Sequence, residues 1–229
     1  MLNEDLHELG SMIFNAISEN CVIEKSDWAI EKINRVMSQF KSAHLIASDF
    51  QIVVPWLDQF NAFTAPGQYI FISRKLFELC RTDEILAFLI AHEMAHHELG
   101  HFSVFPSWFR NISSFNLQLL LMAPYRAFES RIFGPENECD ADRRAIDNCI
   151  KAEFEPTLCL ELFDVLEKHA LDVGDLDMVY GPSESDDELL ENANWETKFK
   201  IWLFQRKRGY LPIRDRKKML TMYIQNINI

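Results

Sequence analysis

The sequence predicts an α+β domain that is mainly helical and carries a small β-sheet beside a central helix. Three observations support this fold class. Long segments repeat apolar residues at helical spacing, two short runs within residues 50–73 are β-branched and aromatic, and 48% of the 229 residues are hydrophobic. A chain of this length can bury a sizeable core. We therefore expect a single domain over residues 1–229, with its core in residues 50–150.

Two helices are expected before the sheet. Residues 4–18 repeat leucine and isoleucine at intervals of three or four positions, and the segment behind Ser26, a good N-cap residue, repeats the same pattern. The runs FQIVVPW (residues 50–56) and QYIFIS (residues 68–73) are the two predicted strands. The segment NAFTAPG between them contains a Pro-Gly turn signal.

The next predicted helix carries four of the chain's seven histidines, within the stretch ILAFLIAHEMAHHELGHF over residues 85–102. Thr82 is its expected N-cap, Asp83 and Glu84 lie near the positive end of its dipole, and Gly100 can end it.

The remaining sequence predicts two more helices, a loop and a helical C-terminal part. The helices cover residues 135–152 and residues 156 to about 169. Residues 172–192 contain eight acidic and no basic residues around a Gly-Pro-Ser turn, which predicts a mobile acidic loop. Residues 193–229 are basic and helical in pattern, and we expect them to return and pack on the main body.

Charge and composition exclude several classes of partner and location. The formal net charge is −12 and the pI is about 5.0, so the field of the chain repels phosphates and we expect no nucleic-acid partner. The acidic first residues do not resemble a secretory signal, and the longest apolar stretches are shorter than the roughly 18–20 residues of a membrane span. We therefore expect a cytoplasmic protein without a transmembrane segment and with reduced cysteines.

His92 and His96 are four positions apart, which places their side chains within about 40° of each other on one helix face. Two imidazoles can then bind the same metal ion. Glu93 is turned too far round the helix to be an equal ligand, but it is close enough to reach a water on the metal. This is the HExxH arrangement.

The residue types of this motif favour zinc chemistry. Zinc held by nitrogen and carboxylate ligands, with one position left to water, lowers the pKa of that water toward about 7 and polarises a substrate carbonyl. Glu93 is then expected to take the proton of the water and to pass it to the leaving amine. The motif therefore predicts one Zn²⁺ per chain and hydrolysis of amide bonds.

The other two histidines are out of phase with this site. His97 is turned about 100° from His96, and His101 about 140°. The longer pattern HExxHxxGxxH would also need glycine and histidine where the chain has Leu99 and Phe102. We expect His97 and His101 to cap, to pack or to meet solvent rather than to bind the metal.

The third ligand is expected from the segment ENECDAD. Glu138 and Asp142 share a helix face, so Glu138 can bind the metal while Asp142 accepts a hydrogen bond from a ligand histidine. The alternative is a solvated acidic helix start, because Glu136 and Asp140 lie nearby where the helix dipole also favours acids.

Three blocks together resemble the gluzincin metallopeptidases that include the HtpX-like heat-shock proteases and the zinc-type CAAX prenyl proteases. They are NAFTAPGQYIFISRKLFEL, LIAHEMAHHELGH, and ECDAD within RIFGPENECDADRRA, and they span about residues 50–150. The resemblance implies a zincin-like metalloprotease domain with His92, His96 and Glu138 as zinc ligands. It also implies that Glu93 is the catalytic base and that Asp142 supports a ligand.

The resemblance further implies a role for the second predicted strand. In such proteases an extended substrate pairs with a strand at the edge of the cleft, which would involve Tyr69, Ile70 and Phe71. The alternative is that these residues form an ordinary core strand. The family also commonly has a His-Pro pair late in the chain, but here Leu211 precedes the proline.

The oxyanion-stabilising group is left open by this departure. Tyr210, Arg214 and Arg216 are candidates, and each is equally well explained as a surface residue. The apolar stretch over residues 105–128 also has two interpretations. It is either packed in the core or an oligomer contact, or it lines a groove or touches a membrane surface peripherally. The oligomeric state is not predicted.

The function predicted from the sequence is zinc-dependent endopeptidase activity on extended or unfolded polypeptides. One alternative is a zinc-containing binding or chaperone-like protein without efficient hydrolysis, which the missing His-Pro pair favours. Another is a latent protease whose cleft is blocked by its own loop over residues 172–192. An intact Glu93 argues against the binding protein, since a purely structural zinc site needs no base.

Overall fold

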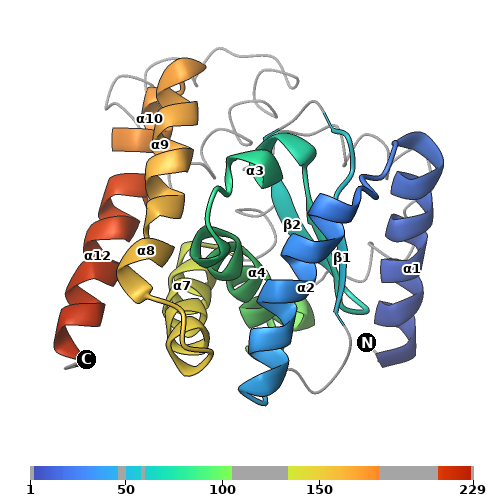
Figure 1. Ribbon diagram of the computed structural model, residues 1–229, viewed down its shortest axis with the longest axis horizontal. Helices are drawn as coiled ribbons and strands as arrows, with labels where there is room; N and C mark the ends of the chain where they lie inside the picture. The colour runs from blue at the N-terminus through green and yellow to red at the C-terminus, as the bar shows by residue number, and fades with distance from the viewer. Residues whose placement is uncertain (1–2, 46–49, 58–59, 105–133, 181–210, 228–229) are drawn as a thin grey trace, which may run out of the picture.

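The computed structural model describes residues 3–45, 50–57, 60–104, 134–180 and 211–227. In these ranges, helices surround a small three-stranded sheet, which confirms the predicted α+β, mainly helical fold (Figure 1). None of the described helices is long and apolar enough to cross a membrane.

The described elements follow the predicted order closely. The helices are α1 (Asn3–Asn20), α2 (Asp27–Ser42), α3 (Arg74–Leu79), α4 (Asp83–Glu98), the short 3-10 helix η1 (His101–Val104), α7 (Gly134–Lys151), α8 (Pro156–Cys159), α9 (Glu161–Asp172), α10 (Leu176–Tyr180) and α12 (Ile213–Asn226). The strands are β1 (Gln51–Val53), β2 (Ala62–Ala65) and β3 (Tyr69–Ile72). The single helix predicted from residue 156 is in fact two helices, which meet at Leu160.

The sheet has the strand order β1-β3-β2, with β3 parallel to β1 and antiparallel to β2. Strand β2 was not predicted, because its short sequence AFTA is poor in β-branched residues and directly precedes the turn signal. That turn exists as well. Gly67 adopts a φ of 78°, a conformation that glycine tolerates without steric cost, and it connects β2 to β3.

The strand order corrects one prediction. Tyr69, Ile70 and Phe71 lie on the central strand, where β1 pairs with one side of the backbone and β2 with the other. An extended substrate therefore cannot pair with these residues, and the alternative of an ordinary core strand holds. Sequence alone could not reveal this, because the edge position depends on the third strand.

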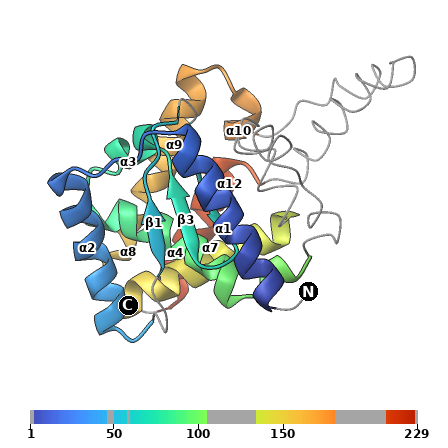
Figure 2. The ribbon, with the colours of Figure 1, turned by 90° about the vertical axis from the view of Figure 1, so that its right-hand side faces the viewer.

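The two faces of the sheet pack against different helices, as the alternation of side chains along each strand requires. Phe63 and Phe71 point to one face and pack against Leu9 and Ile13 of α1, which crosses that face (Figure 2). The alternate residues of β3, including Ile70, belong to the main core with α2 and α4.

Helix α4 lies at the centre of the molecule between the sheet and α7. All residues from Ile85 to His96 are buried, which explains why the helix has no polar face. Thr82 caps it as predicted, accepting a hydrogen bond from the backbone N–H of Ile85. Its C-terminal end follows the prediction too, because Gly100 has a φ of 70° just after the helix.

The predicted acidic loop is only partly a loop. Asp172 is the last residue of α9, and Leu176–Tyr180 form α10, so helix extends into its first half. Residues 181–192 of this loop lie outside the described residues, as do residues 193–210 and the apolar stretch over residues 105–128. The C-terminal helix α12 is formed as predicted and packs against α7 and α9.

Candidate metal centre

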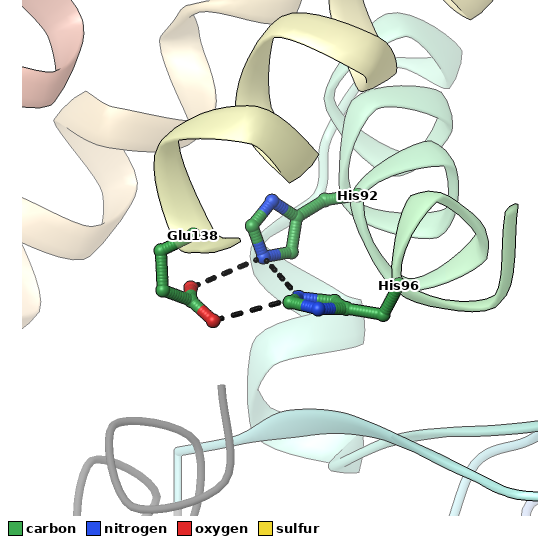
Figure 3. Close-up of side chains that lie close together, drawn as sticks. All are labelled: His92, His96 and Glu138. Carbon is green, nitrogen blue, oxygen red and sulfur yellow. Dashed lines mark hydrogen bonds and ion pairs between the residues drawn. The ribbon is translucent and has the colours of Figure 1, made fainter. Parts of the chain in front are cut away.

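Two helices bring three potential metal ligands together. His92 and His96 project from the buried helix α4, and Glu138 projects toward them from α7, which packs along α4 (Figure 3). One donor atom from each residue can be chosen so that all three lie within 4.8 Å of one another, and all three residues are buried. The spacing of four residues thus places both imidazoles on one face of α4, as the sequence predicts.

The distances between these atoms suit a small tetrahedral ion. The Nε2 atoms of His92 and His96 are 3.3 Å apart, and they lie 3.4 and 3.5 Å from the two carboxylate oxygens of Glu138. Two ligands at about 2.05 Å from zinc, separated by a tetrahedral angle, are about 3.3–3.4 Å apart. Two imidazole nitrogens and one carboxylate are also the ligand types that zinc accepts. The residues therefore fit the ion.

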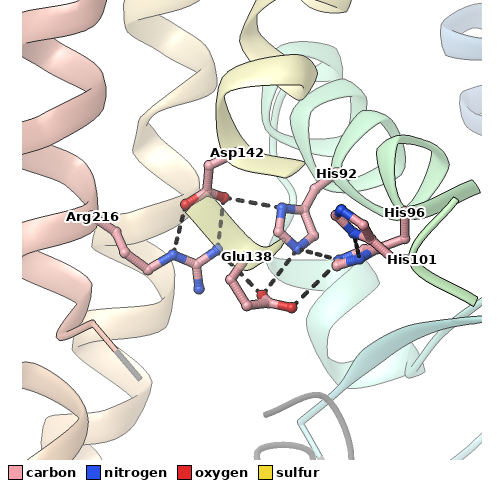
Figure 4. A network of polar contacts seen from close by, with 6 residues as sticks. All are labelled: His92, His96, His101, Glu138, Asp142 and Arg216. Atoms are coloured by element: carbon pink, nitrogen blue, oxygen red, sulfur yellow. Dashed lines mark hydrogen bonds and ion pairs between the residues drawn. The ribbon is translucent and has the colours of Figure 1, made fainter. Parts of the chain in front are cut away.

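The other nitrogen of His92 is held by a chain of charged groups. Its Nδ1 lies 3.0 Å from Asp142 on α7, and Arg216 of α12 donates two hydrogen bonds of 2.7 Å to the same carboxylate (Figure 4). Burial alone would raise the pKa of Asp142, but Arg216 and then His92 outweigh it and lower the pKa to about 2. Asp142 is therefore an anion at neutral pH.

The electrostatic environment of the cluster favours a cation. Burial disfavours a charged imidazole at His92, but the contacts with Asp142 and Glu138 outweigh it and hold its pKa well above the ordinary value. At His96, burial and the neighbouring His92 act together and hold the pKa well below that value. Two buried carboxylates close to two imidazoles are thus arranged to stabilise positive charge between them.

Glu138 and Asp142 are not part of a solvated helix start. Both are 2% exposed, whereas Glu136 and Asp140 on the same helix are exposed, as the dipole-based alternative expects of all four. Glu93 is completely buried on α4 beside His92. A buried carboxylate next to a metal-binding histidine is suited to proton transfer, because the surrounding protein fixes its position.

The two remaining histidines have different environments. His97 packs edge-on against Phe50 and contacts the Thr64 hydroxyl at 2.5 Å, and burial lowers its pKa to about 4, so the expected packing role is confirmed. His101 lies closer to the metal site than its helical phase predicts. It is buried, and its Nδ1 lies 2.8 Å from Nδ1 of His96 (Figure 4).

Two of the three candidates for the oxyanion group lie in the part of the chain that the structure describes. Arg214 is exposed and forms an ion pair with Glu167 at 2.6 Å, so it is a surface residue. Arg216 is buried against Asp142, and one of its guanidinium nitrogens lies 3.8 Å from a carboxylate oxygen of the proposed ligand Glu138. Tyr210 lies outside the described residues.

Comparison with known families agrees with this geometry. The model of peptidase family M48 matches residues 24–171, which is more than half of the chain. The chain belongs to peptidase family M48. This family includes the HtpX-like and CAAX prenyl metalloproteases, so the resemblance seen in the three sequence blocks is confirmed. A search of curated proteins found no match to this M48 member.

Membership of M48 makes the chain a member of a family of metal-dependent peptidases, whose substrates are polypeptides. The match covers α4 and α7, which carry all three proposed ligands, but it ends before α12. Arg216, the partner of Asp142, therefore lies outside the matched segment. In the sequence Arg216 is one of several basic residues in the predicted C-terminal helix. Nothing in that pattern indicates that it pairs with Asp142.

Proposed function

We propose that this M48 member is a zinc-dependent endopeptidase that cleaves extended or unfolded polypeptides, with His92, His96 and Glu138 as ligands. The observation that supports this most is the cluster of these three buried residues. The two histidine Nε2 atoms lie 3.3 Å apart and 3.4 and 3.5 Å from the two Glu138 oxygens, and Glu93 lies beside the histidines on α4. When bound, zinc would polarise the scissile carbonyl and lower the pKa of a water molecule.

The catalytic base in this proposal is Glu93. Its carboxylate accepts a proton from the attacking water as the water oxygen bonds to the carbonyl carbon. The same carboxylate then gives the proton to the amide nitrogen as the carbon–nitrogen bond breaks, so that a free amine leaves. Burial of Glu93 keeps its carboxylate in place throughout.

The ligand histidines need their own support for this chemistry. Asp142 lies within hydrogen-bonding distance of Nδ1 of His92, so the proton of a neutral His92 is kept on that nitrogen and Nε2 is left as a donor to the ion. Arg216 in turn neutralises Asp142 and fixes its orientation through two hydrogen bonds.

Strand β2 replaces β3 as the proposed partner of an extended substrate. Among the described residues β2 pairs with a strand on one side only, and it also contacts α4. An extended polypeptide could add to such an edge through main-chain hydrogen bonds. This mode of binding favours unfolded chains, because folded proteins seldom expose a free extended segment.

The function is tested by cleavage of unfolded casein with zinc-loaded wild type, Glu93→Gln and Glu98→Gln. Glu98 is the matched control, since it lies on the same helix but its carboxylate accepts a hydrogen bond from the side-chain amide of Asn148. We expect all three proteins to hold one zinc ion, and Glu93→Gln alone to lose cleavage, by about 10²–10⁴-fold. Zinc-loaded wild type that fails to cut casein, or equal cutting by Glu93→Gln, would contradict the proposal.

A further inference from the structure

The chain turns sharply after the metal-binding helix and places His101 against it. Helix α4 ends at Glu98, and Gly100 adopts a φ of 70° while its N–H donates to the carbonyl of His97 at 3.2 Å. This left-handed residue ends the helical path, so η1 begins with His101 beneath the last turn. In a continuous helix His101 would point about 140° away from His96.

The contact between the two imidazoles requires a proton. Nδ1 of His96 and Nδ1 of His101 are 2.8 Å apart, and both residues are buried (Figure 4). Two nitrogen lone pairs at this distance would repel each other, so one nitrogen must be a donor and the other an acceptor. The two rings therefore determine each other's tautomer.

The metal site decides the direction of this hydrogen bond. Nε2 of His96 faces His92 and Glu138, and it can bind a metal only when it carries no proton. The single proton of a neutral His96 must then lie on Nδ1, where it is donated to His101. The opposite arrangement would put the proton of His96 on Nε2, pointing into the ligand cluster.

We propose that His101 is a positioning residue that holds His96 in its metal-binding tautomer and orientation. This role rests on the proposed zinc site. It differs from the support of His92, where an anionic carboxylate accepts the proton and Arg216 compensates its charge. At His96 the acceptor is a neutral imidazole, so the tautomer is fixed without adding another negative charge to a buried site that already holds the carboxyl groups of Glu93, Glu138 and Asp142.

The test compares His101→Phe with His101→Asn. Phenylalanine keeps a ring of similar size but has no acceptor, whereas the Oδ1 of asparagine can occupy the place of Nδ1. We expect zinc affinity, measured by chelator competition, to fall about 10–100-fold in His101→Phe and to recover to within a few-fold of wild type in His101→Asn. The visible spectrum of the cobalt-substituted protein should shift in His101→Phe alone. His97→Phe is the control for loss of a half-buried histidine on the same helix.

A second measurement needs no variant. In zinc-loaded wild type, ¹⁵N NMR should show a protonated Nδ1 at His96 and an unprotonated Nδ1 at His101; the reverse assignment would overturn the proposal. Equal zinc affinity in wild type and His101→Phe, or equal losses in His101→Phe and His101→Asn, would also overturn it. Failure of wild type to bind zinc would refute the zinc site as well, whereas zinc binding without casein cleavage would refute only the hydrolytic function.

Discussion

Replacement of Arg216 by leucine is the sharpest test of the charged chain behind the metal site. Arg216 and Asp142 are both less than 10% exposed and share two hydrogen bonds of 2.7 Å. Leucine keeps part of the apolar stem of the arginine but removes the guanidinium. Asp142 is then left as a buried carboxylate that still contacts His92 but has lost its arginine.

The size of the effect follows from this burial. Removing one partner of a buried ion pair costs about 3–5 kcal/mol, because the other charge stays desolvated. The pKa of Asp142 gives a second measure, since it is lowered from 3.8 to about 2 despite burial, mainly by Arg216. That difference corresponds to about 2 kcal/mol of favourable interaction. We therefore expect Arg216→Leu to lower the free energy of unfolding by about 2–4 kcal/mol.

Urea unfolding of the zinc-free proteins measures this loss directly. Arg214→Leu is the matched control, because Arg214 lies two residues earlier on α12 and its exposed ion pair with Glu167 should contribute less than about 1 kcal/mol. Arg216→Lys should be intermediate, since lysine keeps the charge but not the paired geometry. Similar small losses in Arg216→Leu and Arg214→Leu would refute the reasoning.

Three other outcomes are expected. Gly10→Ala should cost about 1–3 kcal/mol in urea unfolding while Ser11→Ala changes little, because a Cβ at Gly10 would lie 1.6 Å from the carbonyl oxygen of Pro66. Burial raises the pKa of the Cys80 thiol from 9.0 to about 12, so above pH 9 the unfolded chain loses a proton that the folded protein keeps. The stability that this thiol contributes is therefore complete below pH 9 and falls by about 1.4 kcal/mol per pH unit above it. Between pH 8 and 10, wild type should lose about 1.4 kcal/mol more stability than Cys80→Ala. Zinc at 100 times its Kd should stabilise wild type by about 2.7 kcal/mol, and an unchanged melting temperature in EDTA would argue against the site.

Features that depend only on residues close together in the chain were predicted correctly. The spacing of His92 and His96 places them on one face of any helix, and Thr82 and Gly100 mark the ends of that helix through their own backbone preferences. Glu138 needed more, because an acidic helix start explains the same residues until the HExxH motif and the family resemblance are considered together.

The expected positions of His101 and of β3 differ from the observed ones, because both positions depend on neighbouring segments of the chain. The phase argument for His101 assumed a continuous helix, although Gly100 was itself the predicted helix end. The edge position of β3 was inferred without β2, whose sequence is too short and too rich in alanine to predict a strand. In both cases the local pattern was interpreted correctly. A neighbouring segment, the turn at Gly100 or strand β2, determined which residues lie beside it.

Arg216 shows why the C-terminal helix belongs in any account of the site. The family match ends at residue 171, yet Arg216 lies 74 positions after Asp142 and supplies the charge that compensates it. Carboxylates buried around the proposed ligands are tolerable only with compensating cations, and in zinc-free protein Arg216 is the permanent cation among the described residues that contact Asp142. We therefore infer that residues 24–171 alone would hold the ligands but leave Asp142 without its arginine partner, and that α12 is needed for a stable centre.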